Sequence, residues 1–155
     1  MKKLVTLLAT FALLSLSLLT AQADEMTSSL VTKKSNYSVT ETLDRLAGAV
    51  TNGGGVIFAR VDHAAGAKKV GEDLRPTEMI LFGNPKIGTP AMLASQTMGL
   101  DLPLRALAWE DESGQVFLSY HLPVLIGDPH GLKDDHAALQ KLTGVMKKLE
   151  AVATQ

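Results

Sequence analysis

The chain has 155 residues, no cysteine and a formal net charge of −1. The absence of cysteine excludes disulfides, thiolate metal ligands, thiol redox chemistry and covalently attached c-type haem. The balanced charge gives no electrostatic reason to expect nucleic acid as a partner.

The first 23 residues have the pattern of a secretory signal peptide. Lys2 and Lys3 form a positive start, residues 4–19 are almost wholly apolar, and Ala21-Gln22-Ala23 is a small-x-small cleavage site. A membrane anchor is the weaker interpretation, although the apolar run approaches spanning length, because the cleavage motif follows directly. We therefore expect cleavage after Ala23. The mature protein would then lie in a bacterial periplasm or outside the cell, without membrane contact.

The mature chain is expected to form one domain behind a short leader. Residues 24–35 are polar and rich in serine and threonine, and we interpret them as a flexible leader. Residues 36–155 have the length of a single domain, and residues 36–39 are a candidate short strand.

The clearest predicted element is a helix that begins near Ser38. Ser38 and Glu41 have capping-box spacing. Apolar residues follow with helical periodicity at Leu43, Leu46, Ala47 and Val50. The glycine triplet 53–55 ends the helix, because glycine adopts left-handed backbone conformations at little cost.

The middle of the chain alternates β-rich runs with short helical patterns. Residues 56–61 and 78–82 are predicted strands, and residues 64–70 form a short helical pattern between them. Thr89 is a good N-cap residue and Pro90 fits a first helical position, so we expect a helix over residues 90–98.

The last third of the chain contains a hairpin signal and a long amphipathic helix. Residues 104–110 and 115–122 flank a turn over residues 111–114. The final helix has an apolar stripe at Leu132, Leu139, Leu142, Val145, Met146, Leu149 and Val152. We therefore predict an α+β fold with β-α-β4-α-like order: an antiparallel sheet of four to five strands with helices packed on one face.

Several motifs in one order resemble a known bacterial family, Domain of Unknown Function 302. They are Tyr37 with the helix start at residues 40–46, Asp62-His63, residues 71–76, Phe82-Gly83-Asn84-Pro85, Gly88-Thr89-Pro90, Met92 and Gly99-Leu100-Asp101-Leu102-Pro103. The resemblance covers about residues 36–122. It implies a small α+β fold of TATA-binding-protein-like topology, often seen as a homodimer. It implies no activity.

The segment around Gly83 and Gly88 nearly matches a nucleotide-binding P-loop. The two glycines have the P-loop spacing and Thr89 follows, but the lysine of that motif is missing, and Lys86 lies inside the loop instead. Two prolines also remove amide donors. Nucleotide hydrolysis is therefore unsupported, and the glycines are explained as turn residues before a capped helix.

One functional interpretation of this segment remains beside the structural one. Free backbone amides at a helix start near Thr89, with Asn84 and Lys86, are candidates to bind a carboxylate or another small anion.

Four histidines raise the possibility of a copper or zinc site. His63 and His121 are the best candidate pair if their strands are neighbours in the sheet. No histidines have the i, i+4 spacing of a zinc peptidase, so hydrogen bonding or helix capping is the simpler role for His63.

Asp101 is an unusual carboxylate, since it lies between Leu100 and Leu102. Either it turns the chain before Pro103, or it faces a pocket together with His63. No serine has the Gly-x-Ser-x-Gly context of a hydrolase.

Two function classes follow from these residues. The first is a secreted, non-enzymatic module, a homodimer, that binds a small anionic ligand or a protein without any cofactor. Its candidate ligand-binding residues are His63, Asn84, Lys86, Thr89 and Asp101. The alternative is an enzyme or a metal-binding protein that uses Asp62, His63 and Asp101, with no assignable catalytic residue.

Overall fold

A computed structural model describes residues 29–155, so the expected signal peptide and its cleavage site lie outside the described residues. The elements in chain order are β1 (Leu30–Lys34), α2 (Val39–Asn52), β2 (Val56–Asp62), α3 (His63–Lys69), β3 (Thr77–Gly83), α4 (Pro85–Ala94), the 3-10 helix η2 (Gln96–Leu100), β4 (Leu104–Glu110), β5 (Val116–His121), the 3-10 helix η3 (Asp128–His130) and α5 (Ala137–Thr154).

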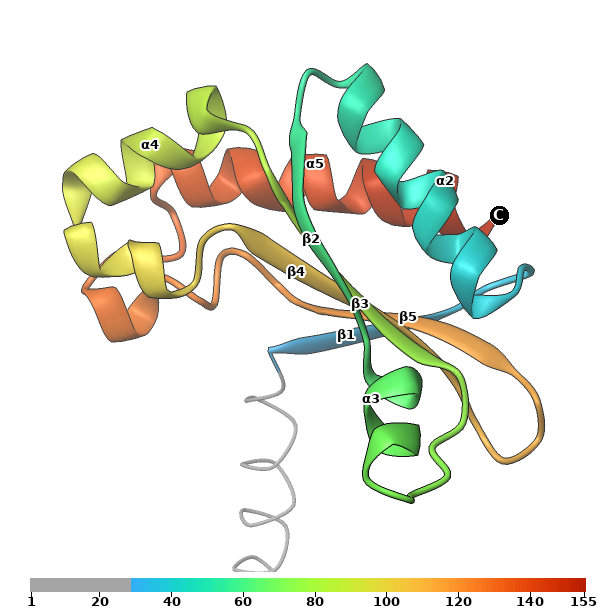
Figure 1. Ribbon diagram of the computed structural model, residues 1–155. Helices are drawn as coiled ribbons and strands as arrows, with labels where there is room; N and C mark the ends of the chain where they lie inside the picture. The colour runs from blue at the N-terminus through green and yellow to red at the C-terminus, as the bar shows by residue number, and fades with distance from the viewer. Residues whose placement is uncertain (1–28) are drawn as a thin grey trace, which may run out of the picture.

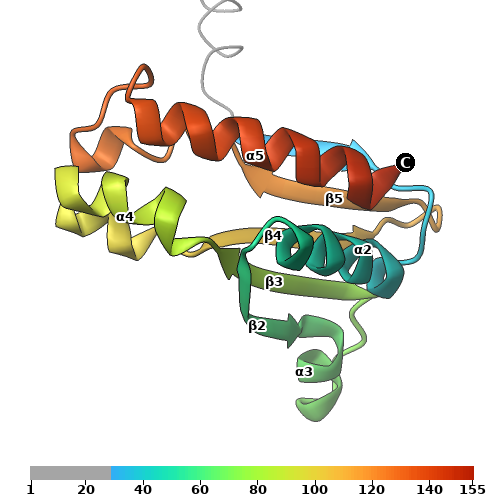
Figure 2. The same ribbon diagram turned by 90° about the horizontal axis from the view of Figure 1, so that it is seen from above.

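The five strands form one antiparallel sheet in the order β1-β5-β4-β3-β2. Helices α2 and α5 lie side by side over one face of this sheet (Figures 1 and 2). We call this covered side the inner face and the opposite side the open face. The predicted α+β class, with an antiparallel sheet and helices on one face, is confirmed.

The core lies between the inner face and these two helices. Its large, fully buried apolar side chains come from both layers and from η2. They are Leu43 and Leu46 of α2, Ile80 and Leu118 of the sheet, Leu139 and Met146 of α5, and Met98 of η2. Strand alternation brings every second residue of β3, β4 and β5 to this face, because successive side chains point to opposite sides of a sheet. The helical stripes predicted for α2 and α5 supply the other half of the core.

The predicted start of α2 is confirmed in detail. Ser38 is the N-cap, and its hydroxyl accepts a hydrogen bond from the backbone amide of Glu41 at 3.2 Å. The helix ends at Asn52, where the glycine triplet begins. Gly54 has a φ of +73°. A Cβ on Gly55 would lie 2.7 Å from Val50 Cγ1, so this turn requires glycine at both positions.

The flexible-leader prediction is wrong for its second half, because Leu30–Lys34 form the edge strand β1 beside β5. Its consecutive polar residues Thr32, Lys33 and Lys34 resemble a leader, because an edge strand exposes much of its surface. Residues 36–39, a candidate strand, instead form a bend and the first residue of α2.

The helix after Gly83 also differs from the prediction. It begins at Pro85 and ends at Ala94, with Asn84 as its N-cap and Pro90 inside it. Residues 96–100 form a separate 3-10 helix. Asparagine is a stronger cap than threonine, and Pro85 occupies the first helical position that the sequence offered equally to Pro90.

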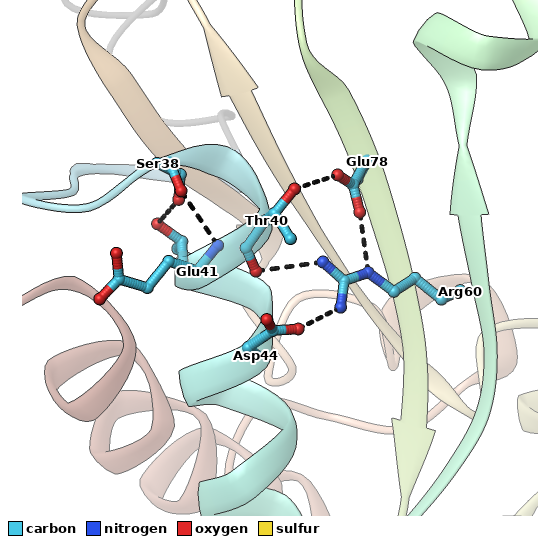
Figure 3. A network of polar contacts seen from close by, with 7 residues as sticks. Ser38, Thr40, Glu41, Asp44, Arg60 and Glu78 are labelled. Atoms are coloured by element: carbon cyan, nitrogen blue, oxygen red, sulfur yellow. Dashed lines mark hydrogen bonds and ion pairs between the residues drawn. The ribbon is translucent and has the colours of Figure 1, made fainter.

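A polar network fastens α2 to the edge strand β2 (Figure 3). Arg60 Nη1 lies 2.5 Å from Asp44 Oδ1, and Arg60 Nε lies 2.8 Å from Glu78 Oε2. Arg60 also donates to the carbonyl oxygen of Thr40 at 3.1 Å. Partial burial lowers the pKa of Arg60, but the hydrogen bonds and charges of Asp44 and Glu78 outweigh it and raise that pKa above its usual value. The guanidinium therefore stays charged.

The open face carries apolar side chains in a row across the strands. The strand register places Leu81, Met79, Leu107, Trp109 and Phe117 on it. The rings of Trp109 and Phe117 stack with centroids 5.0 Å apart, and Trp109 Nε1 donates to Ser119 Oγ at 2.9 Å. In Figure 1, α2 and α5 lie on the opposite side of the sheet from this face.

Candidate functional site

The residues around Gly83 and Asn84 form the junction between β3 and α4. The side chain of Asn84 makes two hydrogen bonds there. Its Oδ1 accepts from the backbone amide of Lys86 at 3.0 Å, which caps α4, and its Nδ2 donates to the carbonyl oxygen of Gly54 at 2.9 Å. Asn84 therefore ties the start of α4 to the turn between α2 and β2.

A first hollow, of about 180 Å³, opens beside this junction. Its lining is apolar apart from Asn84 and Thr89. The apolar side chains are Phe58, Pro85, Met92, Leu102, Pro103, Leu104 and Leu142. Phe58 is 56% exposed and belongs to the irregular register of β2 between Ile57 and Ala59. The irregularity sets this ring at the rim of the hollow instead of in the regular alternation.

A second hollow, of about 230 Å³, is lined by residues of the same junction. It shares Gly83, Asn84, Leu104 and Leu142 with the first, so the two hollows adjoin. Its other walls come from α2 and the turn after it, β3, the start of α4, and α5. They are Ala49, Val50, Gly53, Gly55, Phe82, Ile87, Val145, Lys148 and Leu149. We call the two hollows together the junction cleft.

The structure divides the predicted ligand-binding residues into two groups. Asn84 and Thr89 line the junction cleft. Lys86 is exposed on the first turn of α4 and lines neither hollow. The motif at residues 82–90 therefore does lie at a cleft, but the side chains that line this cleft are mostly apolar and not suited to a small anion.

The anion site expected at Thr89 is wrong in its geometry. Thr89 lies inside α4, where backbone amides are already used in helical hydrogen bonds. The true start of the helix is Asn84, and its side chain occupies the amide of Lys86. Free amides at Thr89 are therefore not present to hold an anion.

The predicted partners of Asp101 lie at the other end of the sheet. Asp62 is the last residue of β2, where it pairs with Glu78, and His63 follows it. Asp101 instead precedes β4, whose first residue pairs with Phe82 at the opposite end. Seven-residue strands span about 20 Å, so these residues do not meet. Asp62 instead caps α3 by accepting from the amide of Ala65 at 2.8 Å.

The histidine pair is separated in the same way. His63 follows β2 at one edge, His121 ends β5, and strands β3 and β4 lie between them. His121 Nδ1 is 2.9 Å from Ser29 Oγ. The strands are not neighbours, so the condition for a shared metal is not met. Across residues 29–155, no group of three or more His, Asp or Glu side chains is arranged to hold a metal ion.

Asp101 has a partner that the sequence interpretation missed. Its Oδ2 lies 2.7 Å from His130 Nε2, and its Oδ1 accepts from Arg105 at 3.1 Å. His130 Nδ1 lies 2.8 Å from Thr97 Oγ1. The side chain of His130 is only 5% exposed. The only signal for this pairing was that both residues lie in turn-rich segments.

This hydroxyl–imidazole–carboxylate line has the order of a hydrolytic triad. However, none of Thr97, Asp101 and His130 lines either hollow of the junction cleft. The cluster joins η2 to η3, and we assign it the structural role of holding these two short helices together.

The fold and the cleft define a small α+β domain with one helical layer and an apolar site at its central strand-to-helix junction. The chain belongs to the family described as "Domain of unknown function DUF302", whose model matches residues 31–149. The resemblance drawn from the sequence motifs is confirmed.

Known proteins share parts of this chain. It is 50% identical over 119 residues to "Fluoride-specific ion channel FluC 1" of Brucella suis biovar 1, which covers 76% of this chain and 47% of that protein. The same identity and length relate it to "Fluoride-specific ion channel FluC 2" of Brucella melitensis biotype 1, with 44% of that protein covered. The chain thus spans less than half the length of these relatives. Among residues 29–155, no helix has the length and apolar character needed to cross a bilayer.

A solved structure shows the same fold. The crystal structure of an uncharacterised conserved DUF302 protein from Bacillus stearothermophilus has a TM-score of 0.68. It is 16% identical, and the match covers 83% of this chain and 97% of that chain.

Asn84 gives a direct test of the junction. Asn84→Ala removes both side-chain hydrogen bonds, and we expect the free energy of unfolding in chemical denaturation to fall by about 1–2 kcal/mol. Asn52→Ala is the control, because this exposed side chain makes no hydrogen bond within the described residues. Equal effects of the two substitutions would show that Asn84 does not tie the junction.

Proposed function

We propose that this chain is a secreted, non-enzymatic binding domain whose junction cleft holds a small apolar ligand. The observation that carries the proposal is the composition of the cleft. Two adjoining hollows are lined almost wholly by apolar side chains, at the segment that carries the family motif. Ligand sites are typically concave and mostly apolar, with few polar groups.

The polar atoms near the cleft support binding rather than catalysis. Both side-chain hydrogen-bonding atoms of Asn84 are already used within the protein. A catalytic site needs a nucleophile or a general acid or base within reach of the substrate. The cleft linings contain no histidine, aspartate or glutamate.

The relatives named as fluoride channels are about twice as long as the segment that they share with this chain. We therefore do not extend the printed channel activity to this chain. Their greater length supports the idea that the segment shared with this chain is used together with other protein segments.

Phe58 provides the first test. The neutral fluorescent probe N-phenyl-1-naphthylamine should bind the mature protein saturably and be displaced by 1-decanol. Phe58→Ala removes one wall of the first hollow and should weaken probe binding by roughly five- to tenfold. Leu93→Ala is the control, since Leu93 is 82% exposed on α4 and lines neither hollow. Probe binding that is equal in all three proteins would contradict a site in the cleft.

The secreted location in this proposal rests on the signal-peptide pattern of residues 1–23. Such a pattern is expected of a binding domain that acts outside the cytoplasm. Expression of the full chain in a bacterial host should yield periplasmic protein whose N-terminal residue is Asp24 and whose intact mass is that of residues 24–155. Protein that keeps Met1 and stays with the membrane fraction would favour an anchor instead.

A second interaction is proposed for the open face: a homodimer in which two sheets pack face to face. Leu107, Trp109 and Phe117 supply the apolar centre, while Arg105 and Thr32 lie among them. Stacked sheets pack about 10 Å apart through such side chains.

Trp109 makes this dimer measurable, because it is the single tryptophan of the chain. We expect native mass spectrometry to show a dimer at micromolar concentration, with Trp109 emission shifting to the red on dilution. Leu107→Glu should give a folded monomer, because it places a charge at the centre of the interface. Leu93→Glu should remain dimeric. A wild-type protein that is monomeric at all concentrations would rule the dimer out.

A further inference from the structure

The junction cleft has an uneven distribution of charge. The first hollow has only the neutral side chains of Asn84 and Thr89 among its polar lining residues. The second hollow has Asn84 and Lys148 among its polar lining residues, so an exposed lysine is the single cation that lines an otherwise apolar space.

Lys148 has no protein carboxylate to neutralise it. It takes part in none of the ion pairs found within residues 29–155. On α5 the positions three and four residues away are Gly144, Val145, Ala151 and Val152, so no acidic side chain lies next to it on the helix. The nearby Glu150 accepts a hydrogen bond from Tyr120. Lys148 is therefore available to an anion.

The side chain of Asn84 is engaged within the protein, so Lys148 is the polar group of the cleft that we expect to bind the head group of a ligand. Asn84 Oδ1 and Nδ2 both make hydrogen bonds within the protein, to Lys86 and Gly54. The cleft thus offers two adjoining apolar hollows and one charged side chain, Lys148, in the lining of the second.

We propose that the ligand of the junction cleft is an aliphatic monocarboxylate of fatty-acid type. Its chain lies along the two hollows past Leu104 and Leu142, and its carboxylate meets the ammonium group of Lys148. This inference rests on the proposed function, since it names the ligand class of the same cleft. Burial of each methylene favours binding by about 0.8 kcal/mol, so the chain supplies most of the affinity and the lysine selects the head group.

The test compares decanoate with 1-decanol, which has the same chain length without a charge. Both are titrated against the bound probe in the wild-type protein and in Lys148→Gln and Lys148→Glu. Lys147 is the matched control, because it is the neighbouring exposed lysine of α5 and lines neither hollow. The control substitutions are Lys147→Gln and Lys147→Glu.

We expect Lys148→Gln to weaken decanoate binding by about two- to fivefold, the range of an ion pair formed by an exposed lysine. Lys148→Glu should weaken it further, because it replaces attraction with repulsion. The affinity for 1-decanol should be unchanged in every lysine variant. Raised salt should weaken decanoate binding in the wild type and not in Lys148→Gln.

The outcomes separate this inference from the proposed function. If decanoate binds equally to the Lys148 and Lys147 variants, the carboxylate class is wrong, and Phe58-dependent binding of 1-decanol still supports an apolar site. If neither decanoate nor 1-decanol displaces the probe, both proposals fail. Loss of decanoate binding in the Lys147 variants to the same degree would show a general charge effect and would also overturn the inference.

Discussion

Leu43 and Leu46 of α2, with Leu139 and Met146 of α5, meet the inner face of the sheet and are almost completely buried there. This contact fixes which side of every strand faces the helices, because a shift of one residue would turn each side chain to the other face. The open face and the cleft are consequences of it. Helices α2 and α5 cover β3, β4 and β5, and α4 begins where β3 ends. The cleft lies where these three helices meet the end of the sheet.

The proposed ligand site and the proposed dimer surface lie on different parts of one small domain. The cleft is apolar with Lys148 among its lining residues, as a small amphiphilic molecule would require. The open face carries the stacked rings of Trp109 and Phe117. The two proposed interactions would therefore use separate side chains. Leu107 and Phe58 can be changed independently to examine each.

The sequence was most informative where the determining contacts are close along the chain. The cap at Ser38, the turn at residues 53–55 and the strands β2, β3 and β4 each depend on neighbouring residues, and all were predicted to within one or two residues. β1 was missed because its partner β5 lies near the other end of the chain. The pairing of Asp101 with His130 depends on how two short helices meet, which no local pattern reports. Thr89 was misplaced because Asn84-Pro85 and Thr89-Pro90 both pair a capping residue with a following proline, and the chain uses the stronger asparagine cap.

Arg60 also affects how the edges of the sheet meet other protein chains. It points a charge toward the inner face from β2, which is an edge strand with unpaired backbone groups, and the neighbouring register at Phe58 is irregular. A charge and a bulge on an edge both hinder the addition of a foreign strand. The opposite edge, β1, carries Lys33 and Lys34. Arg60 and the irregular register thus protect the β2 edge, and the two lysines protect the β1 edge, from the edge-to-edge association that leads to aggregates.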